Sequence, residues 1–428
     1  MLQYLIILLD DASTSYCHYN NERTERKLIS LEDLKAGIFF GMKENLMIQY
    51  VYPSHELPAE YSEVLESIDH SKIMPADNPD VAKADVVVFN NWKQTNGFNF
   101  DANTAYVLRI SKADLFDHKE LVKEIVPKVA KLNVVITDVE SFTDEDFATY
   151  KNVLQYWANE IENLYADGKS PQLNLLTDRM MLDKMNNCGA ADSNVTLAPD
   201  GKFYVCPAFY QANSDTIISK SYNIGSLLEG LGIKNPQLYK LDYAPLCRKC
   251  DAYQCRRCIW LNRKTTLEVN TPSHEQCVVA HLERNASREL LANIRKHGQF
   301  IPEREIKEID YLDPFDFKDE YRNMTHSDLY SRRRFFKKAS GLLALFVVSV
   351  TPITTLAQKS VSTSCENNCN SICHRSCNLL CAHDCGRACA GCCIKSCRNC
   401  CYDTCTGCKN TVKSEVKNDT VIIKKSIQ

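Results

Sequence analysis

The chain has 428 residues, enough for two or three domains, and 14 of its 22 cysteines lie in the last 64 residues. The formal net charge of −3 divides into −8 for residues 1–358 and +5 for residues 359–428. The basic residues are scattered and no stacking aromatic side chains interleave with them, which argues against a nucleic-acid-binding protein.

Residues 1–180 have the pattern of an α/β domain. Apolar runs predict strands at 4–9, 47–52, 85–89, 105–110, 133–137 and 173–176. Helical periodicity separates most of them, at 31–45, 59–68, 114–132 and 143–165, with Thr143 as the N-cap of the last helix. Strands that alternate with helices predict a mostly parallel sheet covered by helices. The pattern leaves open whether this sheet closes into a barrel.

Cys17 and His18 follow the first predicted strand, and no other cysteine occurs before Cys188. A thiol beside an imidazole is a candidate catalytic pair or metal site. The other interpretation is that these residues only form the polar end of a strand. The sequence alone does not separate the two.

Seven cysteines at short spacings form the strongest chemical signal in the body of the chain. Soft thiolates on turns suit tetrahedral iron or zinc, because two ligands can reach one ion without strain in the backbone. A turn at Pro199-Asp200-Gly201 predicts a hairpin that brings the second of these cysteines beside the site. We therefore predict a metal-binding region formed by Cys188, Cys206, Cys247, Cys250, Cys255, Cys258 and Cys277.

This order of cysteines, with four residues between Gly201 and Cys206, resembles the SPASM domain. SPASM domains are the auxiliary iron–sulfur modules of radical S-adenosylmethionine (SAM) enzymes that modify peptides. The resemblance implies one or two [4Fe–4S] clusters, with zinc as the alternative. It also implies that Cys247, Cys250, Cys255 and Cys277 share one cluster, and that Cys188, Cys206 and Cys258 hold another with an open or non-cysteine fourth position. In the four-cysteine stretch, two of the gaps between cysteines are each one residue shorter than in the usual form.

One departure from that family concerns the first strand. Radical SAM enzymes place a Cx3Cx2C motif after it, whereas Ser15-Tyr16-Cys17-His18-Tyr19 contains a single thiol. One thiolate cannot hold a four-iron cluster that leaves an iron free for the cosubstrate. The expected fold is therefore a radical-SAM-like partial (β/α) barrel that lacks the Cx3Cx2C motif. It is not expected to bind SAM productively or to be a self-sufficient radical SAM enzyme.

The segment after the body has the features of an export signal. Basic residues at 332–334 and 337–338 precede an uncharged run at 339–357. The paired arginines followed by Phe335 resemble a twin-arginine signal, and Met324 is a plausible start for a separate precursor. The alternative is a single membrane anchor with membrane contact at 339–357. Both interpretations leave the body in the cytoplasm and send the tail outward through 331–357.

The tail carries a cysteine at every fourth position. Period four keeps the thiols on no single helical face, and the residues between them offer little apolar surface to bury. We interpret these thiols as targets of modification: Cys365, Cys369, Cys373, Cys377, Cys381, Cys385, Cys389, Cys393, Cys397, Cys401 and Cys405. The rival interpretation is a metal-binding or disulfide-rich exported mini-protein.

Body and tail together resemble the CXXX-repeat peptide maturase system, with maturase and precursor fused. The resemblance implies maturation of a ribosomally synthesised Cys-x-x-x repeat peptide, either the chain's own tail or a homologous peptide, beside a partner radical SAM maturase. The alternative is a zinc-stapled peptide-binding scaffold. The expected organisation is a radical-SAM-like α/β domain at 1–180, a SPASM-like domain at 181–290, a helical or linker segment at 291–323, the signal or membrane segment at 324–358, and a disordered tail at 359–428.

Overall fold

The computed structural model describes residues 2–23, 26–212, 222–298, 300, 301 and 306. All of the described residues belong to one compact unit of the chain, bounded by residues 1–311. The predicted signal or membrane segment and the Cys-x-x-x tail lie outside the described residues. Among the described residues, no helix combines the length and the apolar composition that a membrane crossing requires.

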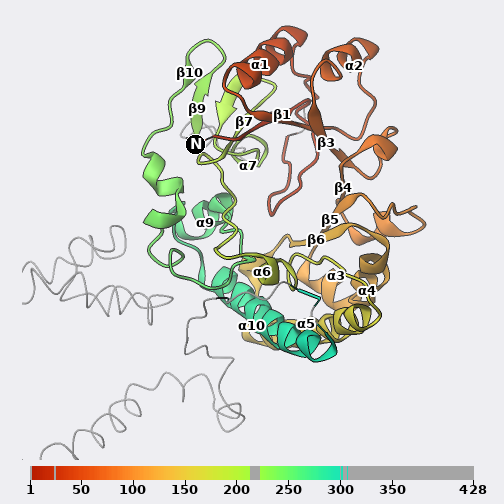
Figure 1. Cartoon of the computed structure of the whole chain (residues 1–428). Helices are drawn as coiled ribbons and strands as arrows, with labels where there is room; N and C mark the ends of the chain where they lie inside the picture. The colour runs from red at the N-terminus through yellow and green to blue at the C-terminus, as the bar shows by residue number, and fades with distance from the viewer. Residues whose placement is uncertain (1, 24–25, 213–221, 299, 302–305, 307–428) are drawn as a thin grey trace, which may run out of the picture. The chain divides into compact units, whose positions relative to one another are not determined.

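A ten-stranded sheet forms the centre of the body (Figure 1). Its order is β10-β9-β8-β7-β1-β2-β3-β4-β5-β6. The parallel strands are β1 (Tyr4–Leu8), β2 (Met47–Val51), β3 (His70–Pro75), β4 (Val86–Phe89), β5 (Ala105–Ile110), β6 (Lys131–Ile136) and β7 (Asn194–Leu197). Antiparallel pairing then adds β8 (Lys202–Tyr204), β9 (Asn223–Ser226) and β10 (Gly230–Leu231). Within the described part of the chain the sheet has two edges, β10 and β6, so it is open.

Helical segments connect the first six strands and cover the outer side of the curve that they follow (Figure 1). The α-helices are α1 (Leu31–Lys43), α2 (Ala59–Leu65), α3 (Lys112–Asp117), α4 (Glu120–Ile125), α5 (Asp144–Ala166), α6 (Asp178–Met181), α7 (Ala208–Gln211), α9 (Ile259–Thr266) and α10 (His274–His297). Short 3₁₀ helices lie at Val81–Lys83, Trp92–Thr95, Val126–Lys128, Val139–Ser141, Pro236–Tyr239 and Leu241–Tyr243. The predicted mixed α/β fold with a large parallel sheet is confirmed.

Two glycines let α1 pack closely on the sheet. A Cβ atom at Gly37 would lie 2.4 Å from Cδ2 of Leu197 in β7, and one at Gly41 would lie 2.8 Å from Cδ1 of Ile48 in β2. The apolar core lies between the sheet and the helices, where Leu5 and most other side chains of β1 and β2 are buried. This packing fixes the position of β1 and therefore of the loop that follows it.

Two predicted elements differ in the structure, and one strand was not predicted. The single helix expected at 114–132 is divided into α3, α4 and a 3₁₀ turn. Pro127 lacks the N–H group that would continue α4, and β6 already begins at Lys131. Residues 173–176 form a turn with one isolated bridge, Leu132 to Leu173, in place of a strand. Strand β3 was not predicted, since its sequence mixes polar residues with a terminal proline. The predicted hairpin is confirmed by the antiparallel pair β7–β8, and the Thr143 cap by a capping box on α5.

Candidate metal centre

The loop between β1 and α1 enters the interior of the body, where Ser13, Thr14 and Ser15 are buried. Arg109 of β5, itself only 5% exposed, holds this loop. Its Nε donates a hydrogen bond of 3.0 Å to the carbonyl oxygen of Cys17, and its terminal nitrogens reach Tyr19 and Asn20. A charged side chain with several acceptors fixes a loop more rigidly than apolar contacts do.

Two further contacts hold the same loop from the other sides. Nδ1 of His18 lies 2.9 Å from the carbonyl oxygen of Ile136, at the end of β6. The hydroxyl of Tyr19 donates to Oε1 of Gln211 in α7, at 2.9 Å. Cys17 is therefore carried on a backbone that is anchored to β5, β6 and α7. Burial lowers the pKa of His18, so its imidazole is neutral at physiological pH.

One group of thiols, called group A below, consists of Cys247, Cys250, Cys255 and Cys277. Cys247 is buried, and Cys250 and Cys255 pack against the same small apolar cluster. Cys277 lies in the first turn of α10, and His281, one turn later, has its Nε2 3.7 Å from Sγ of Cys250. The helix therefore brings Cys277 to the other three thiols.

Buried polar contacts hold the loop of group A in place. Asp251 lies between Arg179 and Arg284, with carboxylate–guanidinium distances of 3.7 and 3.2 Å, and all three side chains are buried. Gln254 donates from Nε2 to the carbonyl oxygen of Ala280 in α10 at 2.7 Å. These contacts attach the segment between Cys250 and Cys255 to α6 and α10, so the positions of its thiols are set by the core of the body.

The electrostatics of group A show that its thiols are close to one another. Burial, together with repulsion from the neighbouring Cys250, raises the pKa of Cys247 to about 12, and Arg257 opposes the shift. Burial also raises the pKa of Cys255 and of Cys277, and repulsion from the other thiols of the group adds to both shifts. Thiols in this environment stay protonated until a cation compensates their charge, so a metal that binds them must displace protons.

The second group of thiols, called group B, consists of Cys17, Cys188, Cys206 and Cys258. Burial raises the pKa of Cys17 to about 11, and Cys188 adds to the shift, whereas Arg256 and Arg109 oppose it. Burial raises the pKa of Cys258 strongly, and Cys188, Cys17 and Cys206 each contribute by repulsion. The same neighbours act on Cys206, whose sulfur accepts hydrogen bonds from the backbone N–H groups that follow it. The structure therefore places Cys17 with the three cysteines from the later segments.

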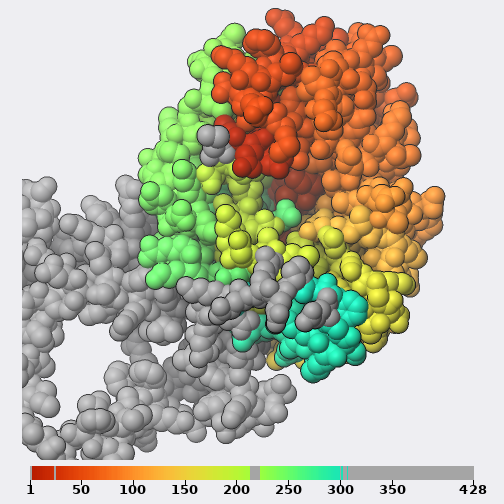
Figure 2. Space-filling view, in the orientation of Figure 1, coloured from red at the N-terminus to blue at the C-terminus, as the bar shows by residue number. Residues whose placement is uncertain are grey.

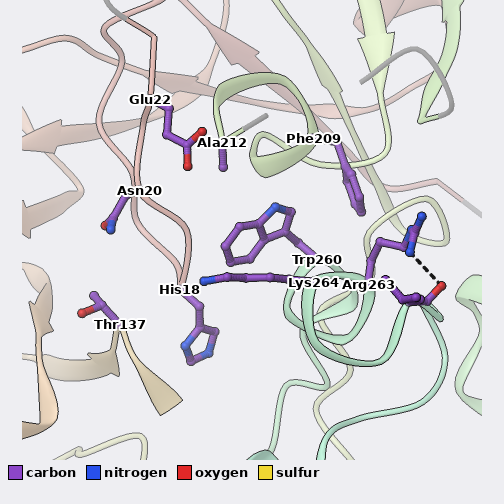
Figure 3. Close-up of a pocket in the computed structure, with 10 residues that line it drawn as sticks. His18, Asn20, Glu22, Thr137, Phe209, Ala212, Trp260, Arg263 and Lys264 are labelled. Atoms are coloured by element: carbon purple, nitrogen blue, oxygen red, sulfur yellow. Dashed lines mark hydrogen bonds between the residues drawn. The ribbon is translucent and has the colours of Figure 1, made fainter. Parts of the chain in front are cut away.

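A cavity of about 270 Å³ is lined by residues that follow three thiols of group B in sequence (Figure 3). Three of the lining residues come shortly after a thiol of group B in sequence. His18 directly follows Cys17, Phe209 of α7 comes three residues after Cys206, and Trp260 of α9 comes two residues after Cys258. Arg263 and Lys264 complete one wall, and Figure 3 shows the Trp260 ring and the Lys264 chain inside the pocket. Figure 2 shows that the face of the body seen there is hollowed between the N-terminal elements in red and the segments in yellow and green.

Of the eight cysteines among the described residues, Cys247 is buried and the other seven are partly buried. Among those residues, no set of three or more His, Cys, Asp or Glu side chains is already arranged as the site of a single metal ion. The donor chemistry nevertheless fits an iron–sulfur cluster, because four thiols are the usual ligand set of [4Fe–4S], and each thiolate then binds a different iron. Four thiols also suit structural zinc. The metal-binding roles of the seven cysteines in 188–277 stay a prediction.

The sequence interpretation did not identify Arg109, Gln211 or His281 as parts of this region. Arg109 had a usable signal, since a charged residue inside the apolar run 105–110 needs a buried partner. His281 follows Cys277 by one helical turn, a spacing that places both on one face of α10. Gln211 had no comparable signal, because its partner Tyr19 is 192 positions away.

Comparisons with known proteins find similarity among solved structures alone. No family profile and no curated protein matches the chain. A hexahistidine-tagged form of anSMEcpe with bound AdoMet is similar at a TM-score of 0.46 and 13% identity, over 68% of this chain and 96% of that one. Native anSMEcpe with bound AdoMet and the Kp18Cys peptide is similar at a TM-score of 0.44 and 13% identity, over 68% and 99% of the two chains.

Proposed function

We propose that the body of this protein holds two thiolate-ligated iron–sulfur clusters and acts in the maturation of a Cys-x-x-x repeat peptide. In this proposal it is an accessory or redox SPASM-type maturase that works beside a separate radical SAM enzyme. Its substrate is its own tail or a homologous peptide. The proposal is carried by eight buried or partly buried thiols whose mutual electrostatic effects run within two sets of four, and by a cavity lined by residues that follow three of these thiols in sequence.

Two sets of four thiols are difficult to explain as core packing alone. The chain places these thiols on loops and at helix starts, where backbone N–H groups are available to the sulfurs, as at Cys206 and Cys258. Hydrogen bonds of this kind tune the reduction potential of a cluster. A cluster bound at either group would supply one-electron chemistry and would stabilise the loops that carry its ligands.

The cavity in Figure 3 supports binding of a peptide. Trp260 offers an apolar face, while Glu22, Arg263 and Lys264 offer charges of both signs around it. A pocket that combines an aromatic surface with a few polar groups is typical of a ligand site. The Cys-x-x-x tail supplies short polar and charged side chains between its thiols, which suit such a mixed surface.

The proposal assigns the initial radical chemistry to another protein. The loop after β1 offers Cys17 as its single thiol, and its neighbours Tyr16, His18 and Tyr19 supply no further thiolate for a three-cysteine cluster site. We therefore expect that the body alone does not cleave S-adenosylmethionine reductively. Its contribution is to bind the peptide and to carry electrons.

The first experiment is anaerobic purification of the full-length chain, followed by measurement of its iron, acid-labile sulfide and zinc. Two [4Fe–4S] clusters correspond to roughly eight iron atoms per chain. Iron and sulfide in this range, with the visible absorbance of iron–sulfur clusters, would support the proposal. Stoichiometric zinc without sulfide would instead identify the body as a zinc-stapled scaffold, and the redox role would be wrong.

A further inference from the structure

We infer that Cys17 is the fourth ligand of the cluster at group B, together with Cys188, Cys206 and Cys258. The inference rests on the proposed iron–sulfur function and goes beyond it, because it adds a thiol that strands β2 to β6 separate in sequence from Cys188, Cys206 and Cys258. It also changes the role expected for Cys17 from catalysis to cluster ligation.

The segments that carry Cys188 and Cys258 are attached to each other close to their thiols. The backbone N–H of Cys188 donates to the carbonyl oxygen of Arg256 at 2.8 Å, two residues before Cys258. Nε of Arg257 donates to Oδ1 of Asn187, also at 2.8 Å. The segments of Cys188 and Cys258 are therefore held side by side by both backbone and side-chain hydrogen bonds.

The Cys17 loop joins the same place. The ring of Tyr19 meets the ring of Trp260 edge to face at a centroid distance of 6.2 Å, which connects the Cys17 loop to the start of α9. The Tyr19 hydroxyl bonds Gln211 at 2.9 Å and so connects the loop to α7, five residues after Cys206. Gln211 in turn donates to the carbonyl oxygen of Ser13 at 2.7 Å, four residues before Cys17. One loop thus contacts both segments that carry neighbouring thiols.

The surroundings of Cys17 carry positive charge. Four thiolates on one cluster give the site a net negative charge, which needs nearby compensation in a partly buried position. Arg109 reaches the Cys17 carbonyl at 3.0 Å, and Arg256 also acts electrostatically on the Cys17 sulfur. Arg109 and Arg256 thus supply two cations near Cys17, which suits a ligand of a negatively charged cluster better than it suits a neutral packing residue.

Complete ligation by four cysteines has a consequence for function. No iron at group B would then have an open position, so the peptide's thiols would not bind there directly. The cavity lined by His18, Phe209 and Trp260 would hold the peptide next to the cluster and not on it. Group B would therefore serve as an electron carrier beside bound peptide, and the loop after β1 would contribute a ligand without generating a radical.

The test uses the full-length chain, purified anaerobically, as wild type and as Cys17→Ser, Cys206→Ser and Cys250→Ser variants. Iron content and electron paramagnetic resonance of the reduced protein are measured for each. We expect Cys17→Ser and Cys206→Ser to lose or alter the same signal, with about half of the iron lost at most. The matched control Cys250→Ser should change the other signal. Retention of the group A signal shows that a Cys17→Ser chain is folded.

Each outcome has a defined meaning. Unchanged iron and unchanged signals in Cys17→Ser, with a loss in Cys206→Ser, would overturn the inference while leaving the proposed clusters in place. A shift of the wild-type group B signal on addition of cyanide would also overturn it, because that shift requires an open iron. Absence of iron from the wild type would instead contradict the proposed function. In that case the zinc content shows whether Cys17 is a metal ligand. If it is, the Cys17→Ser variant should contain one zinc ion fewer than the wild type.

Discussion

Nε of Arg109 in β5 donates a 3.0 Å hydrogen bond to the carbonyl oxygen of Cys17, which joins the strand next to the sheet edge β6 to the loop that follows β1. The same guanidinium reaches Oδ1 of Asn20 at 2.7 Å and Oδ1 of Asn90 at 3.0 Å. One buried side chain therefore links three segments of the body. This relationship makes the position of the Cys17 thiol a property of the fold.

Replacement of Arg109 by lysine should loosen the Cys17 loop. Lysine keeps the charge but cannot make the forked set of hydrogen bonds, so we expect the free energy of unfolding to fall by about 2 kcal/mol. The iron bound at group B should become easier to remove by a chelator. Arg295→Lys, an exposed position at the end of α10, is the matched control. Equal chelator sensitivity of the two variants would contradict the role given to Arg109.

Metal affinity should increase with pH. Burial raises the pKa of Cys17 to about 11 and that of Cys247 to about 12, so at neutral pH the metal must displace protons from these thiols. Each proton displaced makes the apparent affinity rise about tenfold per pH unit. Competition between the metal-free full chain and a chelator for zinc, measured near pH 6.5 and near pH 8, checks this. An affinity that does not change with pH would show that the thiols are already ionised.

Glu283 should make the body less stable as pH rises. It is buried, accepts hydrogen bonds from Tyr150 at 2.9 Å and from Gln254, and burial raises its pKa from 4.5 to about 7. A raised carboxyl pKa contributes stability that is full below pH 4.5 and is lost as pH rises through about 7. Relative to Glu283→Gln, we expect the wild type to lose about 3 kcal/mol across this range.

Denaturant unfolding of the wild type and of Glu283→Gln, measured between these pH values, gives the difference in the free energy of unfolding directly. The contributions of the other titrating groups are common to both chains and cancel in this difference. Glu289→Gln, at an exposed position on the same helix, is the control and should run parallel to the wild type. If Glu283→Gln also runs parallel to the wild type, the carboxyl of Glu283 titrates alike in the folded and unfolded chains.

The cavity can be tested through Trp260. Replacing it by leucine removes the aromatic surface of the pocket but keeps an apolar side chain there. We expect binding of a reduced synthetic peptide of residues 365–381 to weaken roughly tenfold, or about 1.4 kcal/mol. Trp92→Leu, which loses a ring stacked on His118 instead, is the matched control. Similar dissociation constants for the two variants would place the peptide elsewhere.

Much of the parallel half of the sheet could be predicted from the sequence, because its strands are apolar runs separated by periodic helices. Thr143 gave the start of α5 correctly through its capping box. Strand β3 could not be recognised, since Ser71 and Lys72 interrupt its apolar side chains and the neighbouring strands supply its stability. Local pattern is a weak guide wherever tertiary contacts decide.

The candidate site also has one part that the local sequence pattern reveals and another that depends on tertiary contacts. The spacing of Cys247 to Cys258 marks a thiol-rich loop directly, because those residues are neighbours in sequence. The proximity of Cys17 to Cys188, Cys206 and Cys258 depends on the order in which ten strands pair. No short-range pattern contains that information, so the sequence left the fourth position of group B open.

The central claim is that the thiol groups of the body act in modifying the Cys-x-x-x tail. The most direct measurement is the intact mass of the tail, recovered from cells that produce the whole system with either the wild-type chain or a chain carrying both Cys206→Ser and Cys250→Ser. The account predicts that the wild-type tail has a mass different from that of its reduced, unmodified sequence, and that the double variant loses this difference. Identical tail masses from the two chains would contradict it.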